Sequence, residues 1–400
     1  MLFRAAWVLP IEQPPIRNGW VLVEDGRIAG VGGGQPPCRV SQVDLGRAAV
    51  LPGLVNAHTH LELSWMRGLV PPSARMPDWI RALMTLRRTA RADPLRPIEH
   101  AIAEARASGT AVVGDVGNTR LSVAPLEAGP VAAVVFCELI AFNPEDSDRL
   151  VRETREETDR RAADGRVRLA LAAHAPYSVA PGVFRAIAAA RRGGMPRPTA
   201  VHLAESREEI EFLKTGEGEF RALLEELGAW DAGWVCPRCG PVAYLETLGF
   251  IDNRTLVVHG VHLSDDELAR LAARGATLVT CPRSNRWTGA GTPPVARFYR
   301  SGLRIAVGTD SLASVEDLNV FSELHELRRL APAIPAAAFL ESATRHGADA
   351  LGFGAEFGGL ARGKRAELLA VEIPPGVDDV EEYLVSGVEP PQLRWVHAGM

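Results

Sequence analysis

The sequence lacks the features that mark membrane proteins, secreted proteins and disulfide-stabilised domains. No apolar run reaches the roughly 18 residues that a membrane-spanning helix needs, and the start of the chain has neither the apolar core nor the cleavage site of a signal peptide. The cysteines are few, odd in number and scattered, at Cys38, Cys137, Cys236, Cys239 and Cys281. Such a set does not suggest a disulfide framework. These absences favour a cytoplasmic protein.

A block of positive charge is also missing. The 44 lysines and arginines are interspersed with 49 aspartates and glutamates, and the net charge is −5. We therefore expect a small-molecule substrate as partner, rather than a nucleic acid or an anionic membrane. A homo-oligomer is compatible with this composition. At 400 residues the chain is too long for one core of ordinary size, so we expect a large barrel with a smaller domain, or two domains.

Short, nearly continuous apolar runs alternate with amphipathic stretches from residue 50 onward, which is typical of parallel strands covered by helices. The expected strands are 49–57, 110–116, 131–139, 167–173, 199–204, 255–260, 276–281 and 303–309. The expected helices are 77–91, 95–108, 145–164, 181–192, 206–227, 264–273, 292–301 and 316–331. Eight such units predict an α/β fold of the (β/α)8 TIM-barrel type.

Both ends of the chain differ from this pattern. Residues 18–32 alternate apolar and polar side chains around Asp25-Gly26, which predicts a β-hairpin. After residue 357 the chain returns to short apolar runs, which could pair with that hairpin.

Residues that could bind a metal stand at the ends of the expected barrel strands. They are His58, His60, His174, His202, His259 and Asp310. Active sites of (β/α)8 enzymes lie at the carboxyl ends of the strands, so these side chains should converge. One such histidine alone is more often a hydrogen-bonded core residue. Five histidines and an aspartate together are too costly to bury without a common partner.

Three imidazoles and one carboxylate suit a single borderline cation, Zn²⁺ first and Fe²⁺ second. A metal ion with an open coordination position lowers the pKa of its water to about 7 and makes hydroxide available at neutral pH. Glu205, three residues after His202, is well placed to shuttle protons, and Asp310 can bind the metal and accept the proton of the water. The sequence therefore predicts a hydrolytic metalloenzyme.

These residues and the segments around them resemble the amidohydrolase superfamily over essentially the whole chain. The matching segments are LPGLVNAHTHLELS (51–64), AHAPYSV (173–179), VHLAES (201–206), VVHGVHLSDDEL (257–268), CPRSN (281–285) and VGTDS (307–311). Residues 340–371 resemble the closing helix of that superfamily and its return to a β-sandwich. The resemblance implies a catalytic barrel at 50–356 and a small β-sandwich built from 1–49 and 357–400.

Within the superfamily the chain is similar to adenosine-type and S-adenosylhomocysteine-type deaminases and to triazine hydrolases. That resemblance implies one metal ion held by His58, His60, His202 and Asp310. It also implies that Glu205 carries a proton to a ring nitrogen, that His259 polarises or orients the attacking water, and that His174 contacts the substrate. No lysine replaces His174 on the fourth strand, so the two-metal site with a carbamylated lysine is not expected.

Further substrate contacts are expected in two loops. Glu62, Trp65 and Trp79 belong to a segment that resembles the loop over the ribose and base in nucleoside-deaminating relatives; the alternative is that both tryptophans simply pack a helix on the barrel. Arg283, Asn285 and Arg286 follow the seventh strand and are expected to contact the substrate. The two arginines could bind an anionic substrate tail bidentately, unless they form surface salt bridges.

The chain is most similar to the 6-aminodeoxyfutalosine deaminases of menaquinone biosynthesis, whose substrate joins an adenine, a ribose and a benzoate. This similarity implies hydrolysis of a C–N bond at a cyclic amidine, with futalosine and ammonia as products. Alternatives are deamination of S-adenosylhomocysteine, methylthioadenosine or adenosine, and hydrolysis of an amide, a guanidine or a halotriazine. An inactive relative used as a binding protein is disfavoured, because the metal ligands and Glu205 are all present.

The remaining cysteines and histidines are expected outside the site. Cys236 and Cys239 have the spacing of half a zinc knuckle but lack a second pair, so a loop without metal is favoured over a redox pair or a site shared between subunits. Cys281 should line the barrel. The histidines expected to be structural or exposed are His100, His262, His325, His346 and His397, with support of His259 as an alternative for His262.

Overall fold

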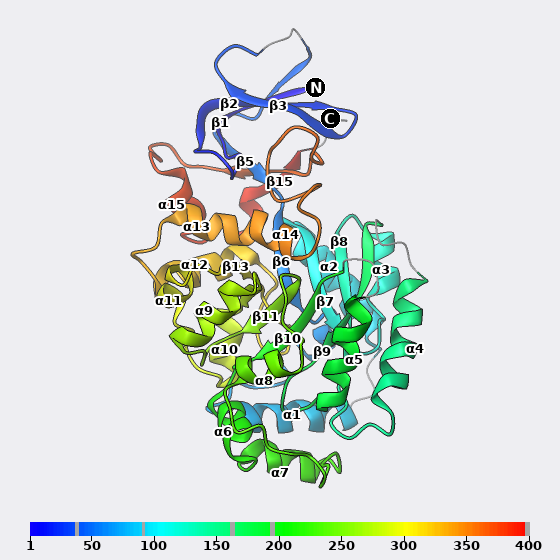
Figure 1. Cartoon of the computed structure of the whole chain (residues 1–400). Helices are drawn as coiled ribbons and strands as arrows, with labels where there is room; N and C mark the ends of the chain where they lie inside the picture. Colours follow the sequence, from blue (N-terminus) through cyan, green and yellow to red (C-terminus); the bar gives the residue numbers. More distant parts are fainter. Residues whose placement is uncertain (37–39, 90–92, 161–164, 193–196, 397–400) are drawn as a thin grey trace.

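A computed structural model describes residues 1–36, 40–89, 93–160, 165–192 and 197–396 (Figure 1). Strands from both ends of the chain form one seven-stranded sheet, in the order β15-β14-β5-β1-β2-β3 with β4 paired to β1. Its strands are β1 (Leu2–Val8), β2 (Ile16–Glu24), β3 (Arg27–Gly33), β4 (Gln42–Asp44), β5 (Ala48–Pro52), β14 (Leu368–Glu372) and β15 (Leu393–Val396). We call it the terminal sheet.

The predicted hairpin is confirmed, since β2 and β3 pair antiparallel around Asp25 and Gly26. Both turn residues have positive φ, 49° and 71°, as the tight turns of twisted hairpins require. The C-terminal segment does pair with the N-terminal part of the chain. Its strand β14 lies antiparallel to β5. Residues 363–366 also contact the hairpin, through the bridge between Arg27 and Arg365 and through backbone hydrogen bonds to Gly26 and Ile28.

Each of the eight apolar runs predicted as parallel strands contains one. These strands are β6 (Leu54–Thr59), β7 (Thr110–Gly117), β8 (Ala132–Leu139), β9 (Val167–Ala173), β10 (Thr199–Leu203), β11 (Thr255–His259), β12 (Thr277–Thr280) and β13 (Arg304–Val307). They form two parallel sheets, β6-β7-β8-β9 and β10-β11-β12-β13, instead of the single continuous ladder expected of a closed barrel. Backbone bonds at the strand ends link the two sheets: His202 N donates to His174 O (2.8 Å), and Asp310 N donates to His58 O (3.0 Å).

The first predicted strand was too long. Residues 49–57 belong to two strands, because the chain leaves the terminal sheet at Pro52 and enters the parallel sheet at Leu54. Gly53, at the junction, has no room for a side chain: a Cβ there would lie 2.6 Å from the Cβ of Ala111 and 2.7 Å from the ring of Trp395. The chain therefore passes between the two parts of the fold at a point of close packing.

The helices are α1 (Met76–Thr89), α2 (Leu95–Ala107), α3 (Val123–Ala128), α4 (Ser147–Asp159), α5 (Pro181–Arg192), α6 (Arg207–Thr215), α7 (Glu219–Glu226), α8 (Pro241–Thr247), α9 (Asp265–Ala273), α10 (Pro282–Thr288), α11 (Val295–Arg300), α12 (Val320–Leu330), α13 (Ala336–Glu341), α14 (Gly347–Ala350) and α15 (Val380–Leu384). Short 3₁₀ segments, η1 (Leu61–Met66) and η3 (Pro390–Gln392), and a π-helical turn, η2 (Ser342–His346), complete the fold. Parts of the predicted helices 77–91 and 145–164 lie outside the described residues.

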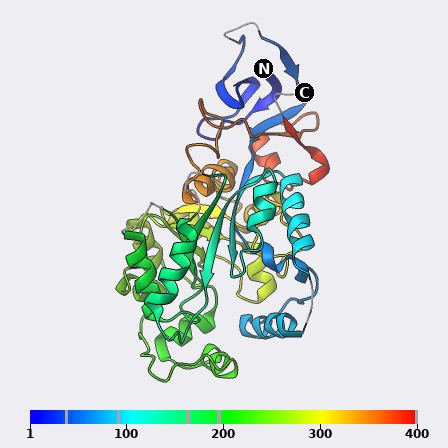
Figure 2. The same ribbon diagram turned by 90° about the vertical axis from the view of Figure 1, so that its right-hand side faces the viewer.

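The helix predicted over 206–227 is wrong in one respect, because α6 and α7 are separate helices. Gly216 and Gly218 between them have φ of 78° and 97°, which an uninterrupted helix does not allow. The helices α1, α6 and α7 lie at the end of the molecule opposite the terminal sheet (Figures 1 and 2). Within the described residues, no helix combines the length and the apolar character that a bilayer crossing requires.

Candidate active site

The predicted strand-end residues come together at the carboxyl ends of the two parallel sheets. His58 lies in β6 and His60 directly follows it, His202 lies in β10, His259 ends β11 and Asp310 follows β13. The backbone is unusual at this point, since Ala204, His259 and Asp310 have φ of 52°, 74° and 64°. Positive φ at non-glycine residues costs free energy and is concentrated at functional sites.

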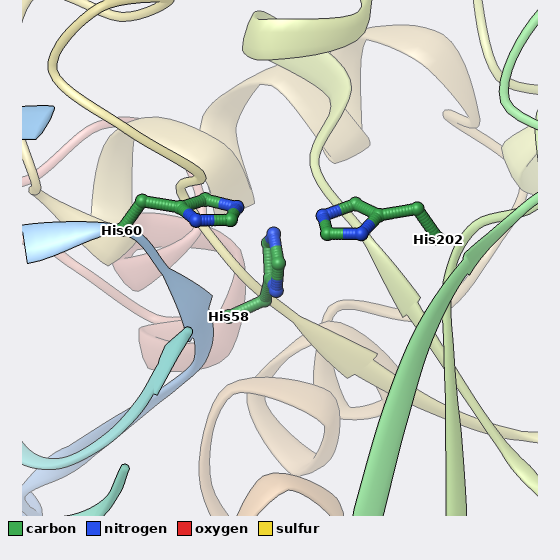
Figure 3. Close-up of side chains that lie close together, drawn as sticks. All are labelled: His58, His60 and His202. Carbon is green, nitrogen blue, oxygen red and sulfur yellow. The ribbon is translucent and has the colours of Figure 1, made fainter. Parts of the chain in front are cut away.

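His58, His60 and His202 point toward one common region (Figure 3). Their ring centroids are 4.8 to 5.4 Å apart, and one nitrogen from each ring lies within 4.8 Å of the others. A second group of the same kind joins His58 to His259 and Asp310. His58 therefore stands at the centre of the cluster.

The contacts of His58 fit a metal ligand. Both of its ring nitrogens are buried and have no hydrogen-bond partner among the described residues, which is costly for an imidazole. Burial and the neighbouring histidines lower the pKa of His58 well below its usual value, and burial lowers the pKa of His60 and His202 to about 4. Neutral imidazoles are the form that binds a metal. The donor set thus suits one divalent cation.

Asp310 completes this arrangement with an oriented carboxylate. Its Oδ1 lies 3.8 Å from His58 Nε2 and 3.6 Å from His60 Nε2, while Ser284 Oγ donates to its Oδ2 at 2.5 Å. The chain just after β13 can lie this close to His58 because residue 308 is glycine: a Cβ there would lie 2.7 Å from the Cβ of His58. Burial raises the pKa of Asp310.

Glu205 and His259 form a neighbouring pair, with Oε1 of the glutamate 3.5 Å from Nε2 of the histidine. The Asn285 amide nitrogen donates to His259 Nδ1 (2.9 Å), which places the proton of neutral His259 on Nε2, facing Glu205. Burial raises the pKa of Glu205 well above its usual value. Glu209 fixes the backbone beneath it, because its carboxylate accepts from Ala204 N and Glu205 N at 2.9 and 3.0 Å.

His174 lies beside the cluster, with its Nδ1 2.5 Å from Ser178 Oγ. Its backbone oxygen accepts from His202 Nδ1 (3.0 Å), so Nε2 of His202 is the nitrogen left to bind a cation. Glu138 Oε1 lies 3.7 Å from the same Nδ1 and has no hydrogen-bond partner among the described residues. Burial raises the pKa of Glu138 to about 8.

A cavity opens above these residues and extends between α1 and α7. The residues at its base include His60, His174, His202, Glu205, His259 and Asp310, and its apolar walls include Met76, Trp79, Ile80, Leu83, Phe220, Leu223, Leu224 and Leu227. Glu62 and Trp79 both line this cavity, as the sequence led us to expect of substrate contacts. Glu62 is held in place by Asn118 N, Thr119 N and Thr119 Oγ1.

The other expected substrate contacts do not line this cavity. Arg283 is largely buried in ion pairs with Glu323 (2.6 Å) and Asp317 (2.9 Å), and Arg286 pairs with Glu326 (2.7 Å). Arg283 is thus engaged by two acidic side chains, whereas Arg286 is more than half exposed and pairs through one nitrogen only. Neither arginine lies in the wall of this cavity. Asn285 contacts His259 instead of a substrate tail.

Trp65 also lies outside the cavity. It is partly buried on η1 and packs with Met66, Leu83 and Trp79 in a small apolar cluster. The alternative that this tryptophan packs a helix on the barrel is the one the structure favours.

Cysteines and remaining histidines stay apart from the cluster. Cys137, Cys236, Cys239 and Cys281 are free thiols, and the metal-binding groups found among the described residues include none of them. His262 Nε2 faces the carbonyl oxygen of Ala290 (2.8 Å) and not His259. His346 Nδ1 faces Ile305 O (3.0 Å), while His100 and His325 are exposed. Cys38 and His397 lie outside the described residues.

Sequence analysis missed several residues of the site. Glu138 is an acidic residue inside the apolar run 131–139 and lines the cavity, and its position near a strand end is a signal that could have identified it. Glu209 gave no such signal, because it belongs to an amphipathic helix and only the fold turns it toward Glu205.

Comparison with known proteins identifies the family. Residues 49–390 match the model of the amidohydrolase family. This chain belongs to the amidohydrolase family. The prediction of a hydrolytic enzyme acting on C–N bonds is thereby confirmed. Relatives of this chain are named as deaminases. The family is metal-dependent, in keeping with the cluster around His58.

Two relatives illustrate the similarity. The 5-methylthioadenosine/S-adenosylhomocysteine deaminase of Moorella thermoacetica is 30% identical, with 96% of this chain and 89% of that protein covered. The aminodeoxyfutalosine deaminase of Deinococcus radiodurans is also 30% identical, with 76% and 74% covered.

Two solved structures share the fold. An adenosine deaminase from Xanthomonas campestris with bound zinc has a TM-score of 0.82 and 27% identity, over 98% of this chain and 90% of that one. The aminofutalosine deaminase of Helicobacter pylori in complex with methylthio-coformycin has a TM-score of 0.85 and 24% identity, over 98% and 99%.

Proposed function

We propose that the protein is a zinc-dependent hydrolase that deaminates an adenine-type nucleoside, with 6-aminodeoxyfutalosine as the first candidate substrate. The observation that carries this proposal is the cluster of His58, His60, His202 and Asp310 beside Glu205 and His259, at the base of a mostly apolar cavity. The reaction replaces the exocyclic amino group by oxygen, so one C–N bond breaks, one C–O bond forms and ammonia leaves.

His58, His60, His202 and Asp310 would hold the metal ion. When bound, a divalent cation supplies a water molecule whose pKa is lowered to about 7. Zinc is favoured by the three-imidazole, one-carboxylate donor set, with Fe²⁺ as the second candidate. The buried, unpartnered nitrogens of His58 are the strongest support for a cation here.

Proton transfer is the task of Glu205, Asp310 and His259. Glu205 is buried, and burial raises its pKa, which favours the protonated form that can donate to the ring nitrogen beside the carbon under attack. Asp310 accepts the proton of the attacking water, and its orientation is fixed by Ser284 and Ser311. His259 presents its Nε2 proton to the developing negative charge.

Substrate binding is the task of the cavity walls. Trp79 and Phe220 offer flat apolar surfaces to a purine. The Trp79 indole N–H is buried without a partner among the described residues, and it can donate to the substrate. His174 and Glu62 supply polar contacts close to the metal site.

Aminodeoxyfutalosine is preferred because one relative in the sequence comparison is named an aminodeoxyfutalosine deaminase and one similar structure is named an aminofutalosine deaminase. The alternative substrates are S-adenosylhomocysteine and methylthioadenosine, on which the Moorella thermoacetica relative is named to act. A role in menaquinone biosynthesis belongs to the first substrate only.

The test is ammonia release by the purified zinc-loaded protein from aminodeoxyfutalosine, S-adenosylhomocysteine and adenosine at equal concentrations. We expect the highest kcat/KM on the first of these nucleosides. No turnover of aminodeoxyfutalosine together with good turnover of either other nucleoside would overturn the preferred substrate. Absence of turnover on all three would overturn the deaminase itself.

We also propose how the chain is divided. The two parallel sheets would form the (β/α)8 barrel of residues 50–356, and the terminal sheet would form a β-sandwich from residues 1–49 and 357–400. We place the enzyme in the cytoplasm.

A further inference from the structure

The walls of the cavity contain one strongly basic group that the proposed chemistry does not use. Arg87, in the last turn of α1, lines the cavity together with Met84, Leu83 and Ile80 of the same helix. Among the described residues that line the cavity, it is the sole lysine or arginine. The acidic residues there are Glu62, Glu138, Glu205 and Asp310.

Arg87 differs from the other arginines of this region in having no acidic partner. Arg75 and Arg81 form ion pairs with Glu219, and Arg81 also pairs with Glu226. Within the described part of the chain, no carboxylate lies within ion-pair distance of Arg87. Burial lowers the pKa of His174 and raises that of Glu138 at the base of the cavity; the positive charge of Arg87 adds a smaller lowering to both.

The carboxylates of the cavity are not arranged to neutralise this arginine. Glu62 is occupied by Asn118 and Thr119, and Asp310 by Ser284 and Ser311. A guanidinium carries five N–H donors and no acceptor, and its planar fork matches a carboxylate. Arg87 is exposed, so its guanidinium is accessible to a ligand, and the neighbouring walls of the cavity are apolar.

We infer that Arg87 binds a carboxylate at the distal end of the substrate and so makes the enzyme selective for anionic nucleosides. This inference rests on the proposed deaminase function. The purine would lie at the metal site, the linking part against the apolar side chains of α1 and α7, and the carboxylate at Arg87. Arg87 thus takes the role that the sequence suggested for Arg283 and Arg286, neither of which lines the cavity.

The experiment compares wild type with Arg87→Met, Arg87→Lys and the control Arg88→Met, in the zinc-loaded full-length enzyme. Arg88 is the next residue of α1, is exposed and does not line the cavity. For each protein, kcat/KM is measured on aminodeoxyfutalosine, which its benzoate makes anionic, and on uncharged adenosine, at low and high salt.

We expect Arg87→Met to lower the ratio of kcat/KM between the anionic and the uncharged substrate about tenfold, mainly through KM, as for loss of a hydrogen bond to a charged group. Arg87→Lys should recover part of this ratio, and Arg88→Met should leave it at the wild-type value. Salt should lower the ratio in wild type more than in Arg87→Met. An unchanged ratio in an Arg87→Met enzyme that still deaminates would overturn the inference and leave the deaminase standing. A wild type that deaminates none of these nucleosides would overturn both.

Discussion

The residue on which the site depends most is His58. Its imidazole is buried at the centre of the cluster, its nitrogens have no partner among the described residues, and its pKa is lowered by burial. A buried polar group without a partner is costly, and a metal ion, which the protein chain itself does not provide, would stabilise His58. The strained φ of His259 and Asp310 likewise indicates that local stability has been given up to position these side chains.

Replacing His58 by alanine should therefore remove the metal without unfolding the protein. We expect the zinc content to fall from about one ion per chain to a small fraction, and kcat/KM to fall at least about 10³-fold, because the cation supplies several kcal/mol of catalysis. Metal content is measured by elemental analysis after dialysis. The matched control is His325→Ala, an exposed histidine on α12, which should retain metal and activity. Full metal content in the His58 variant would contradict the ligand assignment.

Residue types at strand ends could be predicted from the sequence, whereas side-chain partners could not. His58, His202 and Asp310 follow apolar runs, and parallel strands bring their carboxyl ends together. Arg283 looked free in the sequence, but Glu323, its partner, lies 40 residues further on in α12. The sequence did not show that Arg87 lines the cavity. The face of α1 that lines it is set by the packing of α1 against α7, which the sequence alone does not give.

At the scale of elements, α1 and α7 enclose the cavity between them. Arg81 of α1 pairs with Glu226 (3.0 Å) and Glu219 (3.2 Å) of α7, and these pairs are partly exposed. Exposed ion pairs contribute little to global stability, but this network fixes the position of the short helix α7 beside the cavity.

Arg81→Met should loosen α7 rather than unfold the enzyme. We expect KM to rise about threefold to tenfold, faster amide hydrogen exchange in α7, and a change in unfolding free energy below about 1 kcal/mol. The control is Arg149→Met on α4, which removes an exposed ion pair with Glu145. This variant should alter neither KM nor exchange in α7. Unchanged exchange in α7 of the Arg81 variant would show that the pairs do not hold this helix.

Elements were predictable where the pattern was long and uninterrupted. Helix α5 has the predicted bounds, and the hairpin turn at Asp25-Gly26 follows from residues that tolerate positive φ. The boundaries that were predicted wrongly depend on close contacts. Examples are Gly53, between the terminal sheet and the first parallel sheet, and Gly216, after α6. A glycine in the sequence does not show whether it ends a helix or makes room for a neighbour.

At the scale of the whole molecule, buried carboxylates make stability depend on pH. Asp115, at the end of β7, accepts from Leu61 N (2.8 Å) and contacts Ser122, and burial raises its pKa from 3.8 to about 7. The folded protein thus holds a proton that the unfolded chain releases between these two values. The stabilisation from the neutral group is complete below about pH 3.8 and is lost as the pH rises through about 7.

Asp115→Asn should remove this dependence, since the amide keeps both hydrogen bonds and carries no charge. From pH 5 to pH 8, the titration of Asp115 should lower the free energy of unfolding of wild type by on the order of 2–4 kcal/mol. The variant should not show this loss. Urea unfolding at both pH values measures the difference. Asp148→Asn, on the exposed surface of α4, should track wild type. Equal pH dependence in Asp115→Asn and wild type would contradict a neutral Asp115.

The central claim is that this site performs hydrolytic deamination with Glu205 as the proton carrier. The most direct test is ammonia release by Glu205→Gln, measured at full metal content on whichever nucleoside wild type deaminates best. Glutamine preserves the shape of the side chain but cannot donate and recover a proton, so we expect kcat to fall about 10²- to 10⁴-fold with metal retained. Retention of wild-type kcat in the metal-loaded variant would contradict the account.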